Sequence, residues 1–203
     1  NFPAAVPSWY IIPALLTVNS VVWKPSEFTP AVAEAMTAIF HAAGVPKDVL
    51  ITVVAEGKET FEGMVKGLDE GTINKVGFTG STEVGRLIGA KVGEYIQSAC
   101  LELGGKNPMI IMPDADLELA LDGALFARFG TAGQRCTSLG TLWIHDSVYD
   151  KFLKMYADKV ASSKVGDPMQ DVLFGPMIAE KYLATHEENL KLMDSEGNTL
   201  ITV

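Results

Sequence analysis

Apolar residues along the chain gather in short runs, and longer stretches of mixed polarity separate these runs. The runs are rich in Val, Ile and Leu and have the length of buried strands. They predict strands at residues 21–23, 50–54, 75–79, 100–103, 109–112 and 141–145. Residues 199–203 also resemble a strand.

The stretches between these runs have the spacing of amphipathic helices. Thr29 and Pro30 make a good helix start, because a capping hydroxyl precedes a proline that presets the backbone angle. Further helices are predicted at residues 60–68, 116–129, 148–160 and 180–193, with another that ends near residue 93. Strands and helices in alternation predict an α/β fold with a mostly parallel sheet, and the tight loop at residues 104–108 is expected to separate two lobes.

Composition narrows the classes of function. The chain has 16 Lys and Arg against 25 Asp and Glu, a net charge of −9, which disfavours binding to nucleic acid or to anionic membranes. An apolar content of 48% and 19 glycines in 203 residues exclude disorder and collagen-like repeats. No apolar run approaches the roughly 18 residues of a membrane span. Two cysteines are too few for a disulfide framework or a zinc site, so we expect no metal and a reducing, cytoplasmic setting.

Two features suggest an anion site at strand ends. Gly80 to Gly85 joins a predicted strand to a predicted helix, where backbone N–H groups can hold phosphate. The segment lacks the spacing of a dinucleotide fingerprint or a P-loop, so a simple turn is the alternative. Lys24 follows another strand, where α/β sheets bind ligands, and a solvated surface lysine is the alternative there.

Three side chains between residues 100 and 136 are candidates for chemistry. Cys136 follows Arg135, whose positive charge would favour a thiolate, although an inert buried thiol is the commoner fate of a single cysteine. Cys100 lies in an apolar strand and is predicted to be a core residue. Glu102 interrupts the same strand. It either faces water by simple alternation or is partly buried, with a raised proton affinity that suits it to activate a water molecule.

Five segments, read together, carry a resemblance to a known family. They are Asn1-Phe2-Pro3, Trp23-Lys24-Pro25-Ser26-Glu27, residues 78–85, residues 101–106 and Gly133-Gln134-Arg135-Cys136. In this order and spacing they resemble the NAD(P)-dependent aldehyde dehydrogenase superfamily. Residues 129–137 are most similar to its α-aminoadipic semialdehyde dehydrogenase branch. The resemblance implies a Rossmann-like parallel-sheet cofactor domain at residues 1–102. Residues 103–203 would be part of an α/β catalytic domain, with the family fold truncated at both ends.

The resemblance also implies roles for individual residues. Cys136 would be the nucleophile that forms a thiohemiacetal and then a thioester, and Glu102 would activate the hydrolytic water. Asn1, with the backbone N–H of Cys136, would stabilise the oxyanion. The cofactor would be bound by Trp23, Lys24, Pro25, Glu27, Gly80, Ser81 and Leu103. A carboxylate at Glu27 can accept the ribose hydroxyls and would repel a 2′-phosphate, so NAD is preferred to NADP.

Within its own length, the chain departs from the family pattern at two positions. Many members have a lysine after the tryptophan at Trp9, where this chain has Tyr10. Phe174-Gly175-Pro176 resembles a second cofactor motif of the family, but Val172 stands in place of its glutamate.

The resemblance predicts an enzyme that oxidises an aldehyde or semialdehyde, and a homo-oligomer in the full-length form. Two alternatives stay open at this point: a truncated NAD-binding fragment without catalysis, and a thiol esterase that uses Cys136 without a cofactor.

Overall fold

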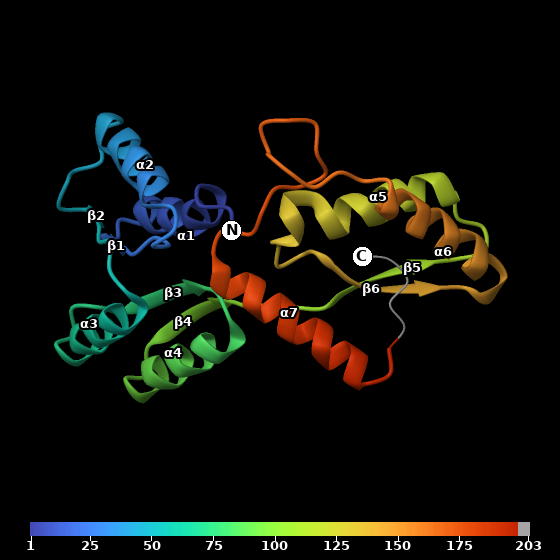
Figure 1. Ribbon diagram of the computed structural model, residues 1–203. Coiled ribbons are helices and arrows are strands. Elements are labelled where there is room, and N and C mark those ends of the chain that lie inside the picture. Colours follow the sequence, from blue (N-terminus) through green and yellow to red (C-terminus); the bar gives the residue numbers. More distant parts are fainter. Residues whose placement is uncertain (199–203) are drawn as a thin grey trace. The chain divides into compact units, whose positions relative to one another are not determined.

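A computed structural model describes residues 1–198 of the chain (Figure 1). The chain divides after Gly104 into two compact units, each with its own strands and helices. No helix of residues 1–198 is long and apolar enough to cross a membrane.

The first unit, Asn1–Gly104, alternates helices and strands. In chain order its elements are α1 (Ala5–Leu16), β1 (Val21–Trp23), α2 (Pro30–Ala42), β2 (Leu50–Thr52), α3 (Gly57–Asp69), β3 (Lys75–Thr79), α4 (Thr82–Glu94) and β4 (Ser98–Glu102). The second unit contains β5 (Asn107–Ile111), α5 (Leu117–Phe129), the short 3₁₀ helix η1 (Gly130–Gly133), β6 (Leu139–Ile144), α6 (Asp146–Ala161) and α7 (Glu180–Ser195). The sequence predicted each of these strands to within a few residues.

All strand pairs of the described residues are parallel, as expected for an α/β fold. They form three two-stranded sheets, β1 with β2, β3 with β4 and β5 with β6. Between the two strands of each pair the chain makes a helical crossover, because parallel neighbours cannot be joined by a tight turn. The α/β prediction is therefore confirmed, with the sheet divided into separate pairs.

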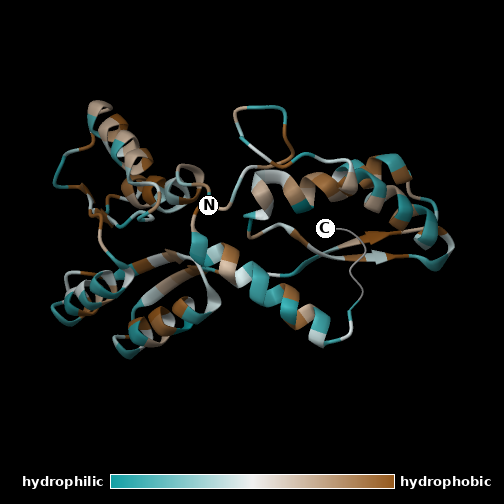
Figure 2. Ribbon diagram, viewed as in Figure 1, coloured by the Kyte–Doolittle hydropathy of each residue, from teal (hydrophilic) through white to brown (hydrophobic). Residues whose placement is uncertain are grey.

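Apolar cores join each sheet to its helices. In the first unit, the core of Ile11, Trp23, Ala33 and Leu50 lies under α1 and α2, and a second core of Leu68, Ile88 and Val92 joins α3 and α4 to the sheet of β3 and β4. In the second unit, α5 and α6 cover the sheet of β5 and β6, and Phe152 is fully buried there (Figure 1). Apolar colour therefore concentrates on the strands, while α7 is largely hydrophilic (Figure 2).

The structure corrects two expectations. The helix α1 was not predicted from sequence, because it contains Pro13, which cannot donate a backbone hydrogen bond. Cys100 was predicted to be a core residue and is exposed. The strand β4 alternates between its two faces, so Ala99 and Leu101 pack against the core of α3 and α4 while Cys100 lies on the opposite face. The predicted strand at residues 199–203 lies outside the described residues.

Candidate active site

The predicted cofactor residues begin at the carboxyl ends of β1 and β2. These strands pair in parallel with Trp23 opposite Thr52, and Val53 N–H donates to the Trp23 carbonyl at 2.9 Å. The segments that follow, residues 24–27 and 53–56, therefore leave the same edge of one sheet. Open α/β sheets bind ligands at this edge.

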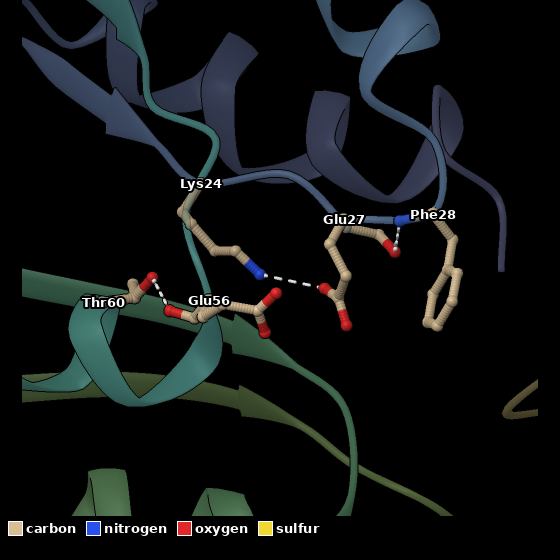
Figure 3. A network of polar contacts seen from close by, with 6 residues as sticks. Lys24, Glu27, Phe28, Glu56 and Thr60 are labelled. Carbon is tan, nitrogen blue, oxygen red and sulfur yellow. Dashed lines mark hydrogen bonds and ion pairs between the residues drawn. The ribbon is translucent and has the colours of Figure 1, made fainter. Parts of the chain in front are cut away.

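Lys24 and Glu27 lie together there. The Lys24 Nζ atom is 3.4 Å from Glu27 Oε2, and both side chains remain partly exposed, at 24% and 39% (Figure 3). The residues beside them hold the backbone of this segment. The Trp23 indole and Pro25 are buried, and the Ser26 hydroxyl accepts the Phe28 N–H at 3.3 Å. A carboxylate beside an ammonium group can accept the hydroxyls of a ribose, so this pair fits the sugar of a dinucleotide.

Glu56 belongs to the same place and was missed from sequence. It is the N-cap residue of α3, its carbonyl accepts the Thr60 hydroxyl at 2.7 Å, and its side chain points toward the Lys24 ammonium (Figure 3). The signal in the sequence was that Glu56 follows the strand of residues 50–52, just as Lys24 follows the strand of residues 21–23, although Glu56 lies further from its strand. Two carboxylates and one ammonium give this site an excess of negative charge.

The predicted phosphate turn at Gly80 and Ser81 is built as a helix start. Ser81 is the N-cap of α4, and its hydroxyl accepts the Val84 N–H at 3.2 Å. The Gly80 N–H donates to the Glu102 carbonyl at 3.1 Å, which brings Gly80 and Glu102 together at the ends of β3 and β4. Leu103 lies against Gly85, where an added Cβ would be 2.4 Å from its Cδ2 atom. The turn therefore presents the N-terminus of α4, a favourable place for an anion.

Glu102 and Asn1 are both exposed. Exposed and partly buried residues alternate along β4, and Glu102 lies at an exposed position. Tyr10 of α1 lies on the same face of this sheet: its hydroxyl is 2.8 Å from Thr79 Oγ1 and its ring covers Gly77. Burial raises the pKa of the Tyr10 phenol above its ordinary value, and the nearby Cys100 and Glu102 add to the rise against the opposing hydrogen bond from Thr79.

Cys136 lies in the second unit, on an irregular segment between η1 and β6, and its thiol is free and exposed. Asn107, the first residue of β5, holds this segment. Its amide Nδ2 donates to the Cys136 carbonyl at 2.7 Å and to the Ser138 carbonyl at 3.1 Å. The Ser138 hydroxyl is buried and donates to the Gly133 carbonyl at 2.8 Å. Sequence reasoning did not identify Asn107, because its partners are backbone atoms 29 and 31 residues along the chain, or Ser138, because its partners are backbone atoms of the turn itself.

Residues 1–198 bring no group of three or more His, Cys, Asp and Glu side chains into a metal-binding arrangement. The site residues thus form two sets. Lys24, Glu27 and Glu56 lie beyond the carboxyl ends of β1 and β2, and the start of α4 follows β3, all in the first unit. Cys136 has a free, exposed thiol in the second unit. An α/β fold with these two sets has the groups that an enzyme combining a nucleotide cofactor with covalent catalysis would need.

Comparison with known proteins makes this class specific. Residues 1–202 match the aldehyde dehydrogenase family. The chain is 41% identical over 180 residues to the benzaldehyde dehydrogenase YfmT of Bacillus subtilis, covering 88% of this chain and 36% of the relative. It is 36% identical over 210 residues to aldehyde dehydrogenase family 7 member A1 of Brassica napus, covering 100% of this chain and 41% of that protein. The chain belongs to the aldehyde dehydrogenase family.

Solved structures agree with this assignment. A betaine aldehyde dehydrogenase variant of Staphylococcus aureus in complex with NAD+ superimposes with a TM-score of 0.93 at 34% identity, covering 100% of this chain and 40% of that one. An Escherichia coli NADP dependent enzyme gives a TM-score of 0.90 at 34% identity, covering 97% of this chain and 40% of that one. The chain therefore spans about two fifths of the length of the proteins it matches.

Proposed function

We propose that the full-length protein oxidises an aldehyde or semialdehyde to the carboxylic acid with NAD+, through a covalent intermediate on Cys136. The observation that carries this proposal is the free, exposed Cys136 on a segment held by Asn107, in a chain of the aldehyde dehydrogenase family. An accessible thiol with a fixed backbone can approach a carbonyl carbon in one orientation, which is what covalent capture requires.

In the proposed reaction the Cys136 sulfur bonds to the aldehyde carbon and gives a thiohemiacetal. The chemistry that NAD+ supplies when bound is acceptance of the hydride that this carbon then loses. The resulting thioester keeps the acyl group on Cys136 until water attacks it, which releases the acid and regenerates the thiol. Capture by sulfur is essential, because a free aldehyde in water is merely hydrated.

Two residues of the first unit complete the proposal. Glu102 takes a proton from the attacking water and so speeds hydrolysis of the thioester. The Asn1 amide and the Cys136 N–H donate to the carbonyl oxygen as it gains negative charge, and one such donor is worth about 3 kcal/mol in related chemistry. Asn1 and Glu102 are exposed, which leaves both accessible to a bound substrate.

For the cofactor we propose NAD+ rather than NADP+. Glu27 beside Lys24 fits a ribose, and the further carboxylate of Glu56 opposes a 2′-phosphate by charge repulsion. Trp23, Pro25 and Leu103 would support the residues that contact the cofactor, since each is wholly or partly buried. Gly80 and Ser81 would present the start of α4 to the pyrophosphate.

We also propose a reducing, cytoplasmic setting and a homo-oligomer for the full-length protein. Both cysteines are unpaired, which suits a reducing environment. Ile110 of β5 and Trp143 of β6 are paired side by side in the sheet and are 68% and 63% exposed. They form an apolar surface that a neighbouring subunit would cover. Light scattering of the purified full-length protein measures the mass of the assembly, and a monomer would remove this part of the proposal.

Aldehyde-dependent NADH formation in the full-length protein tests the main proposal. Replacing Cys136 by Ala is expected to abolish turnover, because no thiohemiacetal can form. In Glu102→Gln we expect the first burst of NADH to persist while steady-state turnover falls by about 10²–10⁴-fold, since only hydrolysis is impaired. Cys100→Ser is the matched control and should retain activity. Full turnover in the Cys136 variant would disprove the proposal, and NAD+ binding without any turnover in the unmodified protein would favour a non-catalytic binding module.

The thiol esterase alternative gives a different result in the same assay. Ester hydrolysis that requires Cys136, together with no aldehyde-dependent NADH, would support it.

A further inference from the structure

The turn that precedes Cys136 has an unusual backbone. Thr131, Ala132 and Gly133 follow one another with φ angles of 58°, 55° and 71°, all in the left-handed region. Glycine adopts this region freely, but a residue with a Cβ does so at a cost, and a β-branched threonine at a greater one. Two such residues in succession persist only where surrounding contacts hold them.

Arg135 supplies these contacts. Its Nε–H donates to the Thr131 hydroxyl at 2.9 Å, and its guanidinium carbon is 4.7 Å from the centre of the Phe126 ring in the last turn of α5. The guanidinium also lies against Gly130, where an added Cβ would be 3.3 Å from Nη2. One side chain thus ties the left-handed turn to the helix before it.

The main chain of Arg135 is fixed as well. Its N–H donates to the Ser138 hydroxyl at 3.2 Å, and that hydroxyl donates in turn to the Gly133 carbonyl at 2.8 Å. Ser138 is 8% exposed, so this pair of hydrogen bonds is shielded from water. The residue next to Cys136 is therefore held from both its backbone and its side chain.

These contacts give Arg135 a geometric role that is distinct from the electrostatic interpretation, in which the cation stabilises the thiolate of Cys136. The guanidinium is engaged with Thr131 and Phe126, both on the N-terminal side of the cysteine. If Arg135 acts by holding the turn in place, it needs the planar guanidinium with its several N–H donors, which lysine lacks. A role through charge would be served by lysine equally well.

We propose that Arg135 is a positioning residue. Its side chain locks the left-handed turn at residues 131–133 and so holds Cys136 in the orientation that attacks the aldehyde. This inference rests on the proposed function, because it takes Cys136 to be the nucleophile. It assigns to Thr131 and Phe126 a share in the same lock, although neither side chain is required to touch the substrate.

The test compares Arg135→Lys, Arg135→Gln and Thr131→Val in the full-length protein. We expect Arg135→Gln to lower kcat/KM for a neutral aldehyde by roughly tenfold, the combined effect of a lost hydrogen bond and a lost cation–π contact. Thr131→Val, which loses only the hydrogen bond, and Arg135→Lys, which keeps the charge but not the fork, should each lower it by about fivefold. The pH midpoint for alkylation of Cys136 by iodoacetamide, measured in a Cys100→Ser background, should stay unchanged in all three. The double variant Arg135→Gln/Thr131→Val should be no slower than Arg135→Gln alone, since both substitutions remove the same hydrogen bond. Thr131→Ser keeps the hydroxyl and should restore most of the rate.

Three outcomes would overturn the inference. In the first, Arg135→Lys retains the full rate while Arg135→Gln moves the alkylation midpoint to higher pH, which would show that charge is what matters. In the second, only the KM for a carboxylate-bearing aldehyde rises, which would assign the guanidinium to the substrate. In the third, no variant changes kcat/KM. A failure of the proposed function itself is distinct, because Cys136→Ala would then keep its turnover whatever Arg135 does.

Discussion

At the scale of single residues, we expect the balance of charge around Lys24 to govern which dinucleotide the first unit accepts. Lys24 is paired with Glu27 at 3.4 Å, and the Glu56 side chain points toward the same ammonium group (Figure 3). One positive and two negative groups leave a net negative charge at the edge where a ribose would bind. An uncharged 2′-hydroxyl would be accepted there, while a 2′-phosphate would meet repulsion.

Removing either carboxylate should therefore raise the affinity for NADP+ relative to NAD+. For Glu56→Gln and for Glu27→Gln we expect the ratio of the two dissociation constants to move by roughly tenfold, the equivalent of about 1.4 kcal/mol. Fluorescence titration of the full-length protein with each dinucleotide measures the ratio. Glu70→Gln, at the opposite end of α3, is the matched control and should leave it unchanged. An unaltered ratio in both site variants would show that the carboxylates do not determine the choice.

Gly77 provides a second test at this scale. A Cβ added there would be 2.6 Å from Cδ1 of Tyr10, and an aromatic ring held by a hydrogen bond to Thr79 cannot easily move aside. Gly77→Ala is expected to lower the free energy of unfolding by about 1–3 kcal/mol, as overpacking does. The control is Gly63→Ala in α3, which meets nothing within 4 Å and should be neutral or stabilising by up to about 1 kcal/mol. Urea unfolding of the two variants compares them directly, and equal stabilities would contradict the clash.

At the scale of elements, α5 shows how sequence and packing cooperate. Asp116 caps the helix, since its carboxylate accepts the N–H groups of Glu118 and Leu119 at 3.1 Å and 3.2 Å. The helix then buries Leu121, Ala124 and Leu125 against the sheet of β5 and β6. Helix α5 both packs the core and carries Phe126, so its stability bears on the segment that contains Cys136.

Loss of this cap should destabilise the second unit. Asp116→Ala is expected to cost about 1 kcal/mol, because two N–H groups lose their acceptor and the favourable interaction with the helix dipole disappears. Asp122→Ala, on the exposed side of the same helix, should change stability by less than about 0.5 kcal/mol. Thermal unfolding followed by circular dichroism separates the two. A larger loss in the Asp122 variant would show that the cap is unimportant.

Elements that depend on local pattern were predictable, and those that depend on distant contacts were not. The strands were evident because apolar runs such as residues 109–112 are bounded by turn residues. Helix α1 was hidden by Pro13, and only its packing through Ile11 against Trp23 shows why the helix forms. Glu56 could not be connected with Lys24 from sequence, because their proximity depends on the parallel pairing of β1 and β2. Exposure of Cys100 likewise depends on which face of β4 the helices cover.

At the scale of the whole molecule, each unit holds a tyrosine that ties folding to pH. Burial raises the pKa of the Tyr156 phenol, and the positive charge of Arg128 opposes part of that rise. Tyr156 packs beside the fully buried Phe152, with 6.4 Å between ring centres. Tyr10 in the first unit has its pKa raised mainly by burial as well. In both units the folded state thus favours the neutral phenol.

The sign of the resulting pH dependence follows from linkage. Below the ordinary tyrosine pKa of about 10, both phenols are protonated in either state, and their contribution to stability is fully present. Above that value the unfolded chain loses these protons more readily than the folded one, so the free energy of unfolding falls as pH rises through the raised values. Urea unfolding between pH 8 and pH 11.5, about the range that spans this transition, should show the fall. Tyr156→Phe should flatten the fall in the second unit, and Tyr10→Phe should do so in the first.

Tyr149→Phe, at an exposed position of α6, is the control and should retain the slope of the unmodified protein. Each variant is compared with the unmodified protein at the same pH, so the effect of lysine titration on the free energy of unfolding is common to both and cancels. Hydrogen exchange resolved along the chain assigns each effect to residues 1–104 or to those after Gly104, and an equal slope in all four proteins would show that neither phenol links folding to pH.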